Sequence, residues 1–122
     1  RRLCERCAEE RPLDEAQRRL FADARLPTPG TLRAEKGCPR CGRTGFLGRT
    51  GVFQVAVFDE SHGSWLADGP PEHEVRERIM QEGTSPLHHE VLQRVADGTI
   101  SFGEAARVAA VAGGGIESAG GV

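Results

Sequence analysis

The chain has 122 residues, of which 38% are hydrophobic and only six are aromatic, so it encodes one domain or two small lobes with a modest core. Its net charge of −2 hides an asymmetry, because residues 1–51 carry 12 basic and 7 acidic side chains, whereas residues 52–122 carry 4 and 11. This basic excess is too small to indicate nucleic-acid binding by itself, and no apolar run approaches the roughly 18 residues that a membrane span needs.

All four cysteines lie in two Cys-x-x-Cys pairs, and the residues concerned are Cys4, Cys7, Cys38 and Cys41. Two such pairs brought together complete a tetrahedral shell that suits Zn²⁺, with Zn–S bonds of about 2.3 Å. A closed shell leaves no position for water or substrate, so we expect a structural Zn²⁺ rather than a catalytic one. Two disulfides, and redox or other metal chemistry, stay open as alternatives.

The chain starts directly at Arg1 without a leader, which predicts a reducing, cytoplasmic setting and a fragment of something longer. In that setting paired Cys-x-x-Cys motifs favour metal over disulfides.

Between the two pairs, residues 12–15 are typical of a helix start, and apolar residues at helical spacing predict a helix over 14–25. Residues 31–35 favour a short strand that enters the second pair. Four glycines then recur at every third position, from Gly42 to Gly51. They could cradle a phosphate, but tight turns with positive φ are the favoured interpretation.

Residues 52–58 read Val-Phe-Gln-Val-Ala-Val-Phe and predict a strand that is buried on both faces. Short helices are expected over 59–68, over 71–82, from Ser85 to Gly98, and from a capping box at Ser101 to residue 112. The fold class is therefore α+β, with a small Cys₄ zinc-binding lobe followed by a buried strand and a cluster of short helices. We expect boundaries at 1–51 for the lobe, 52–112 for the strand and helices, and 113–122 for a disordered glycine-rich tail.

The sequence offers no convincing set of catalytic residues. Lys36, the single lysine, is followed by Gly37, so the chain has no phosphate-binding P-loop. His88 and His89 are adjacent, and adjacent helical residues point about 100° apart, so they favour a surface role over a shared metal. The acidic turn beside His62 resembles an acid–base cluster in composition alone, and no nucleophile–base–orienter set is evident.

The order of these motifs resembles the C-terminal tetracysteine region of type II secretion and type IV pilus assembly ATPases. The specific part is Arg-Leu-Cys-x-x-Cys at residues 2–7, Gly-Cys-x-x-Cys at 37–41, and Gly-x-x-Gly-Phe-x-Gly-Arg-x-Gly-Val-Phe at 42–53. Looser similarity continues at residues 57–60, 81–83, 95–99 and 104–108, so the resemblance covers about residues 1–111.

The resemblance implies a zinc-binding lobe that projects from a hexameric cytoplasmic motor. The family's nucleotide site has no counterpart in this chain, so we expect no enzymatic activity from it alone. The implied partners are the upstream or neighbouring ATPase core and proteins of the secretion or pilus machinery. A hexamer is expected only where the region is joined to a motor domain, and no membrane insertion is expected.

An alternative interpretation is a stand-alone zinc module that binds nucleic acid. Four arginines near the cysteine pairs could contact phosphates, namely Arg6, Arg40, Arg43 and Arg49. Phe46 is the single aromatic residue of that region, which disfavours base stacking. A zinc enzyme is the third interpretation, and the closed Cys₄ shell argues against it.

Overall fold

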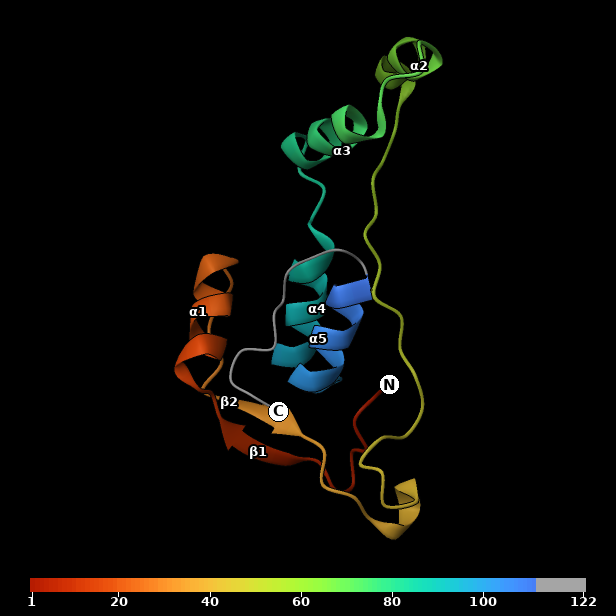
Figure 1. Ribbon diagram of the computed structural model, residues 1–122. Coiled ribbons are helices and arrows are strands. Elements are labelled where there is room, and N and C mark those ends of the chain that lie inside the picture. The colour runs from red at the N-terminus through yellow and green to blue at the C-terminus, as the bar shows by residue number, and fades with distance from the viewer. Residues whose placement is uncertain (112–122) are drawn as a thin grey trace. The chain divides into compact units, whose positions relative to one another are not determined.

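The computed structural model describes residues 1–111, and it consists of five α-helices, a two-stranded sheet and a short 3₁₀ turn (Figure 1). The α+β class with a small cysteine lobe is confirmed. The glycine-rich tail expected at residues 113–122 lies outside the described residues. None of the described helices has the length and apolar character needed to cross a membrane.

The chain forms two compact units, and the first is discontinuous in sequence. Residues 1–52 and the segment that begins at Leu87 form the first unit, and Phe53–Pro86 forms the second. The expected boundary between residues 51 and 52 leaves the last two helices outside the first unit, whereas they share a core with the segments that precede that boundary.

In the first unit, β1 (Glu9–Pro12) pairs antiparallel with β2 (Thr31–Ala34), from Glu9 opposite Ala34 to Pro12 opposite Thr31. Helix α1 (Glu15–Asp23) lies in the connection between the two strands. It begins where expected, because Asp14 accepts a hydrogen bond from the Gln17 N–H at 2.7 Å while the Gln17 side chain accepts from the Asp14 N–H.

The same unit contains α4 (Leu87–Ala96) and α5 (Phe102–Val111), which pack against each other. Their starts are close to those expected, and Ser101 Oγ accepts a hydrogen bond from the Glu104 N–H at 3.2 Å. The core of the unit brings together buried apolar side chains from α1, β2, α4, α5 and the turns beside them, namely Leu13, Phe21, Ala24, Leu32, Val91, Leu92, Val95, Ile100, Ala105 and Ala109. This shared core explains why α4 and α5 belong with the cysteine-containing part.

The second unit contains α2 (Glu60–Ala67) and α3 (Glu72–Gln81), both close to their expected ranges. The expected buried strand at residues 52–58 is wrong. Residues 53–58 adopt no strand, and Phe53, Val55 and Val57 are 71–81% exposed. A strand requires a neighbouring strand to accept its backbone hydrogen bonds, and none pairs with this segment in the described chain.

Helices α2 and α3 are joined through His62, which is 5% exposed. Its Nδ1 lies 2.9 Å from Asp59 Oδ1, and its Nε2 lies 2.7 Å from Glu82 Oε2. The hydrogen bond to Glu82 raises the pKa of His62, although burial opposes the charge. Arg78 reinforces the contact, because its guanidinium lies 4.3 Å from the ring centroid of Trp65 and its Nε donates to Glu82.

We expect the α2–α3 contact to weaken as the pH rises from about 6 to about 8. The pKa of His62 is raised by folding, so its contribution is complete below the unfolded value of about 6.5 and is lost as the pH passes through the higher folded value. Trp65 is the sole tryptophan, so its fluorescence during thermal unfolding reports this unit.

His62→Gln should remove the pH dependence, whereas His73→Gln, at an exposed position on α3, should preserve it. An unfolding midpoint for Trp65 that stays constant over this pH range in the unsubstituted chain would contradict the prediction.

Candidate metal centre

Two tight turns carry the cysteines. In the first, the N–H groups of Cys7 and Ala8 both donate to the Cys4 carbonyl, at 3.2 and 2.9 Å. In the second, a 3₁₀ turn at Pro39–Cys41 follows Cys38, whose carbonyl accepts from the N–H groups of Cys41 and Arg43. Each turn therefore presents two sulfur atoms on the same side of the backbone.

The structure brings all four predicted cysteines together. Every pair of their Sγ atoms lies within 4.8 Å. The Sγ separations are 3.8 Å for Cys4 and Cys38, 3.9 Å for Cys7 and Cys41, and 3.7 Å for Cys38 and Cys41. A tetrahedron with Zn–S bonds of about 2.3 Å has edges of about 3.8 Å. The cluster therefore has the dimensions of a Cys₄ zinc site.

Disulfide bonds and other metals were the alternatives to zinc, and each requires its own sulfur geometry or ligand set. All four are free thiols, with sulfur separations far above the disulfide bond length of about 2.05 Å. Within residues 1–111, no histidine or carboxylate joins the four sulfurs in the cluster. Four sulfur donors in a tetrahedral arrangement fit Zn²⁺ or iron, rather than the oxygen-preferring Mg²⁺ or Ca²⁺.

Backbone N–H groups point at the sulfurs as they do around a thiolate ligand. Gly37 N–H donates to Cys7 Sγ at 3.3 Å, and the N–H groups of Cys38 and Gly45 donate to Cys41 Sγ at 3.3 and 3.2 Å. Burial opposes ionisation of Cys41, but these two donors and the neighbouring thiols lower its pKa to about 6. At Cys7, burial and the hydrogen bonds with the neighbouring thiols raise the pKa to about 11, and the single N–H donor from Gly37 opposes them. Cys41 is thus more readily deprotonated for metal binding than Cys7.

Glycines allow the second turn to approach the sulfurs. Gly45 has φ +83°, and a Cβ there would lie 2.5 Å from Glu35 Cβ. Gly37 has φ +111°, and a Cβ there would lie 2.7 Å from the Arg43 carbonyl oxygen. These positions require glycine for backbone reasons, which agrees with the turn interpretation of the glycine-rich segment.

A contact that the sequence did not reveal connects the cysteine cluster to α5. The Arg1 guanidinium lies 4.1 Å from the ring centroid of Phe46 and donates to Glu104 Oε1 at 2.6 Å. This hydrogen bond holds the pKa of the Glu104 carboxyl well below its usual range. Leu3 adds a bridge to Phe46 and a hydrogen bond from its N–H to the Thr99 carbonyl. No sequence signal could have found this contact, because its two ends are 103 residues apart.

The other residues that the sequence singled out lie outside the cluster. The rings of His88 and His89 meet edge to face, with centroids 4.7 Å apart, and neither belongs to the four-cysteine cluster. Arg6 and Arg40 line a surface pocket beside the cysteine turns, whereas Arg43 takes a left-handed conformation with φ +64° after the second turn.

Comparison with known proteins finds relatives that match nearly the whole described chain. The family described as Type II/IV secretion system protein matches residues 1–107. The chain is 31% identical over 108 residues to the Type II secretion system ATPase E of Vibrio cholerae, covering 88% of this chain and 21% of that protein. It is 30% identical over 105 residues to the Type IV pilus assembly ATPase PilB of Thermus thermophilus, covering 85% of this chain and 12% of that protein.

A third relative, the Type II secretion system protein E of Pseudomonas aeruginosa, is 31% identical over 106 residues, covering 87% of this chain and 21% of its own length. The chain thus spans about a fifth or less of these relatives. The extent of the family match and the gathered tetracysteine motif lead to one conclusion: this chain belongs to the Type II/IV secretion system protein family.

Proposed function

We propose that this chain is the zinc-binding C-terminal accessory region of a cytoplasmic type II secretion or type IV pilus assembly ATPase, with a structural and protein-interaction role. The observation that carries the proposal is the cluster of Cys4, Cys7, Cys38 and Cys41, with all Sγ atoms within 4.8 Å, in a chain that matches this family. Bound Zn²⁺ would supply covalent-like cross-links between the two turns. It would act on folding rather than on catalysis, because four sulfur ligands leave no open position.

The proposal includes no ATPase activity for this chain on its own. Lys36 is followed by glycine instead of serine or threonine, so the phosphate-binding loop of such motors has no counterpart in the sequence. Nucleotide hydrolysis and hexamer formation are assigned to the motor domain of the family, to which this region would be joined.

The exposed apolar segment at residues 53–58 supports an interaction role. Phe53 is 72% exposed, Val57 is 81% exposed, and Phe58 is 44% exposed. Several exposed apolar side chains in one short segment favour a surface that another protein covers. The proposed partner is the ATPase core, of the same polypeptide or of an adjacent subunit, or another protein of the secretion or pilus machinery.

The test measures metal and hydrolysis on one preparation of the chain, purified under reducing conditions. Native mass spectrometry with elemental analysis is expected to find one zinc per chain, and phosphate release from ATP should equal that of a buffer control. A folded, metal-free chain with two disulfides would contradict the zinc assignment. ATP hydrolysis that persists after removal of contaminating ATPases would contradict the accessory role.

A further inference from the structure

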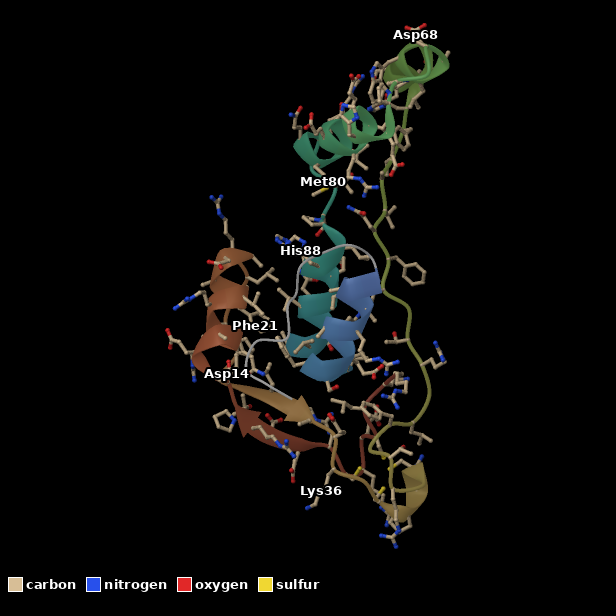
Figure 2. All side chains as sticks on the ribbon, viewed as in Figure 1. Asp14, Phe21, Lys36, Asp68, Met80 and His88 are labelled. Carbon is tan, nitrogen blue, oxygen red and sulfur yellow. The ribbon has the colours of Figure 1, made fainter. Side chains whose placement is uncertain are left out.

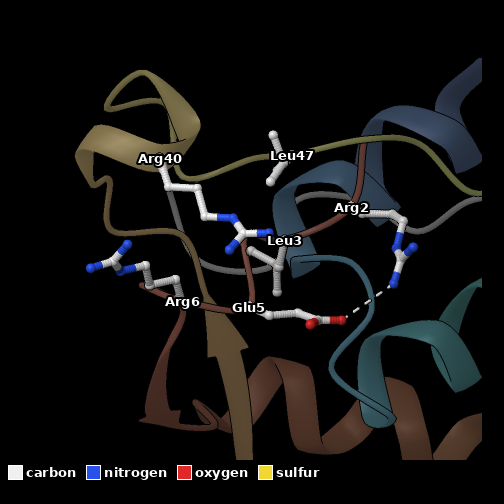
Figure 3. A pocket seen from close by; sticks show the side chains of 6 residues that line it. All are labelled: Arg2, Leu3, Glu5, Arg6, Arg40 and Leu47. Carbon is white, nitrogen blue, oxygen red and sulfur yellow. Dashed lines mark hydrogen bonds and ion pairs between the residues drawn. The ribbon is translucent and has the colours of Figure 1, made fainter.

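A pocket lies beside the two cysteine turns and plays no part in the metal centre. It has a volume of about 570 Å³, and the residues that line it are Arg2, Leu3, Glu5, Arg6, Arg40 and Leu47 (Figure 3). Its volume falls within the range of about 300–1,000 Å³ that is usual for binding pockets. Both turns contribute to it, so the pocket depends on the approach of the two cysteine pairs.

The charges in the pocket are unbalanced. Three arginines and one glutamate line it, and Arg6 and Arg40 form no ion pair with any residue of the described chain. Arg2 is paired with Glu5, but at 3.4 Å and with 80% of the Glu5 side chain exposed. Such exposed pairs contribute little and exchange readily for a better partner.

The apolar part of the lining lies next to the unpaired charge. Figure 3 shows the Arg40 side chain extending across the pocket toward Leu3, while the Arg6 guanidinium turns outward at the rim. Leu47, which is 45% exposed, also lines the pocket. A ligand that enters this pocket meets the Arg40 guanidinium and the exposed side chain of Leu47, whereas Leu3 is only 4% exposed.

We propose that this pocket binds an acidic segment of a partner protein, in which an aspartate or glutamate is adjacent to an apolar side chain. The carboxylate would accept paired hydrogen bonds from the Arg40 guanidinium, a geometry that suits arginine. The neighbouring apolar side chain would pack on Leu47. The inference rests on the proposed interaction role, and it names the surface and the chemistry of the partner.

Two features of the lining favour an acidic protein segment over a polyphosphate ligand. Glu5 places a negative charge in the pocket, which a single carboxylate avoids more easily than a chain of phosphates. No aromatic side chain lines the pocket, so nucleic-acid bases have no stacking surface there. The nearby Phe46 ring is already covered by the Arg1 guanidinium.

The test uses the zinc-loaded chain and a fluorescently labelled octapeptide that alternates glutamate and leucine. Fluorescence anisotropy is expected to show binding that weakens about tenfold in Arg40→Gln, because a charge-assisted bidentate contact is lost. Arg18→Gln is the matched control, since Arg18 is an exposed arginine on α1 outside the pocket, and it should bind within about twofold of the unsubstituted chain. A peptide with glutamine at each glutamate position should bind at least tenfold more weakly.

Leu47→Ser is the second variant, and it should weaken binding without changing any charge. The proposal is overturned if the unsubstituted chain does not bind the octapeptide, or if Arg40→Gln retains its zinc and binds it equally well. It is also overturned if a single-stranded oligonucleotide or vesicles of anionic phospholipid bind more tightly than the peptide and depend on Arg40. Each of these results leaves the zinc assignment intact, whereas a chain that binds no zinc counts against the proposed function itself.

Discussion

Replacing Cys38 with serine is expected to abolish metal binding and to unfold much of the first compact unit. Structural zinc contributes about 10–16 kcal/mol of apparent binding free energy at pH 7, and a small domain has a stability of about 5–15 kcal/mol. A serine hydroxyl is a poor substitute for a thiolate, so the variant loses a free energy comparable with the whole stability of the unit. The turns that contain Cys7 and Cys41 then have no cross-link.

Hydrogen exchange measures where the Cys38→Ser variant loses its folded structure. Protection should fall most around the cysteine turns and α1, and it should also fall in α4 and α5, because their side chains share one core with Phe21 and Leu32. Helices α2 and α3 should retain more protection, because the contact between His62 and Glu82 lies wholly within Phe53–Pro86. Stripping zinc from the unsubstituted chain and restoring it is the control. A uniform loss across both units would contradict this prediction.

Substituting Phe21 with alanine is expected to lower the free energy of unfolding by about 3–5 kcal/mol. Phe21 is fully buried and is among the largest side chains in the core of the first unit (Figure 2). The substitution removes its apolar contacts and leaves a cavity among residues from α1, β2 and α4. Urea unfolding of the zinc-loaded chain, followed by circular dichroism, measures the change.

Phe53→Ala provides a control with the same change in side chain. Phe53 is 72% exposed, so its replacement should change the free energy of unfolding by less than about 0.5 kcal/mol. Equal losses for the two variants would mean that Phe21 does not lie in a packed core. A loss at Phe53 that exceeds the loss at Phe21 would also contradict the exposed position of residues 53–58.

Local patterns in the sequence determined several elements correctly. Hydrogen bonds between residues close in sequence define helix starts, so Asp14 and Ser101 were recognisable without knowledge of the fold. The spacing of Cys38 and Cys41 likewise produces its own turn, because the Cys41 N–H reaches the Cys38 carbonyl. The approach of the four sulfurs to one another could therefore be predicted from the two pairs, whereas their binding of a metal stays a prediction.

Tertiary structure alone decided the elements whose partners are distant. Strand β1 has the sequence Glu-Glu-Arg-Pro and no apolar alternation, and it exists because β2 pairs with it. Residues 52–58 have a strongly strand-like composition, yet no neighbouring strand in the described chain accepts their backbone hydrogen bonds. The assignment of α4 and α5 to the first unit follows from a core that forms only when the chain returns to α1 and β2. Backbone pairing and core packing are long-range interactions, so sequence periodicity identified which segments were apolar but not which segments would cover them.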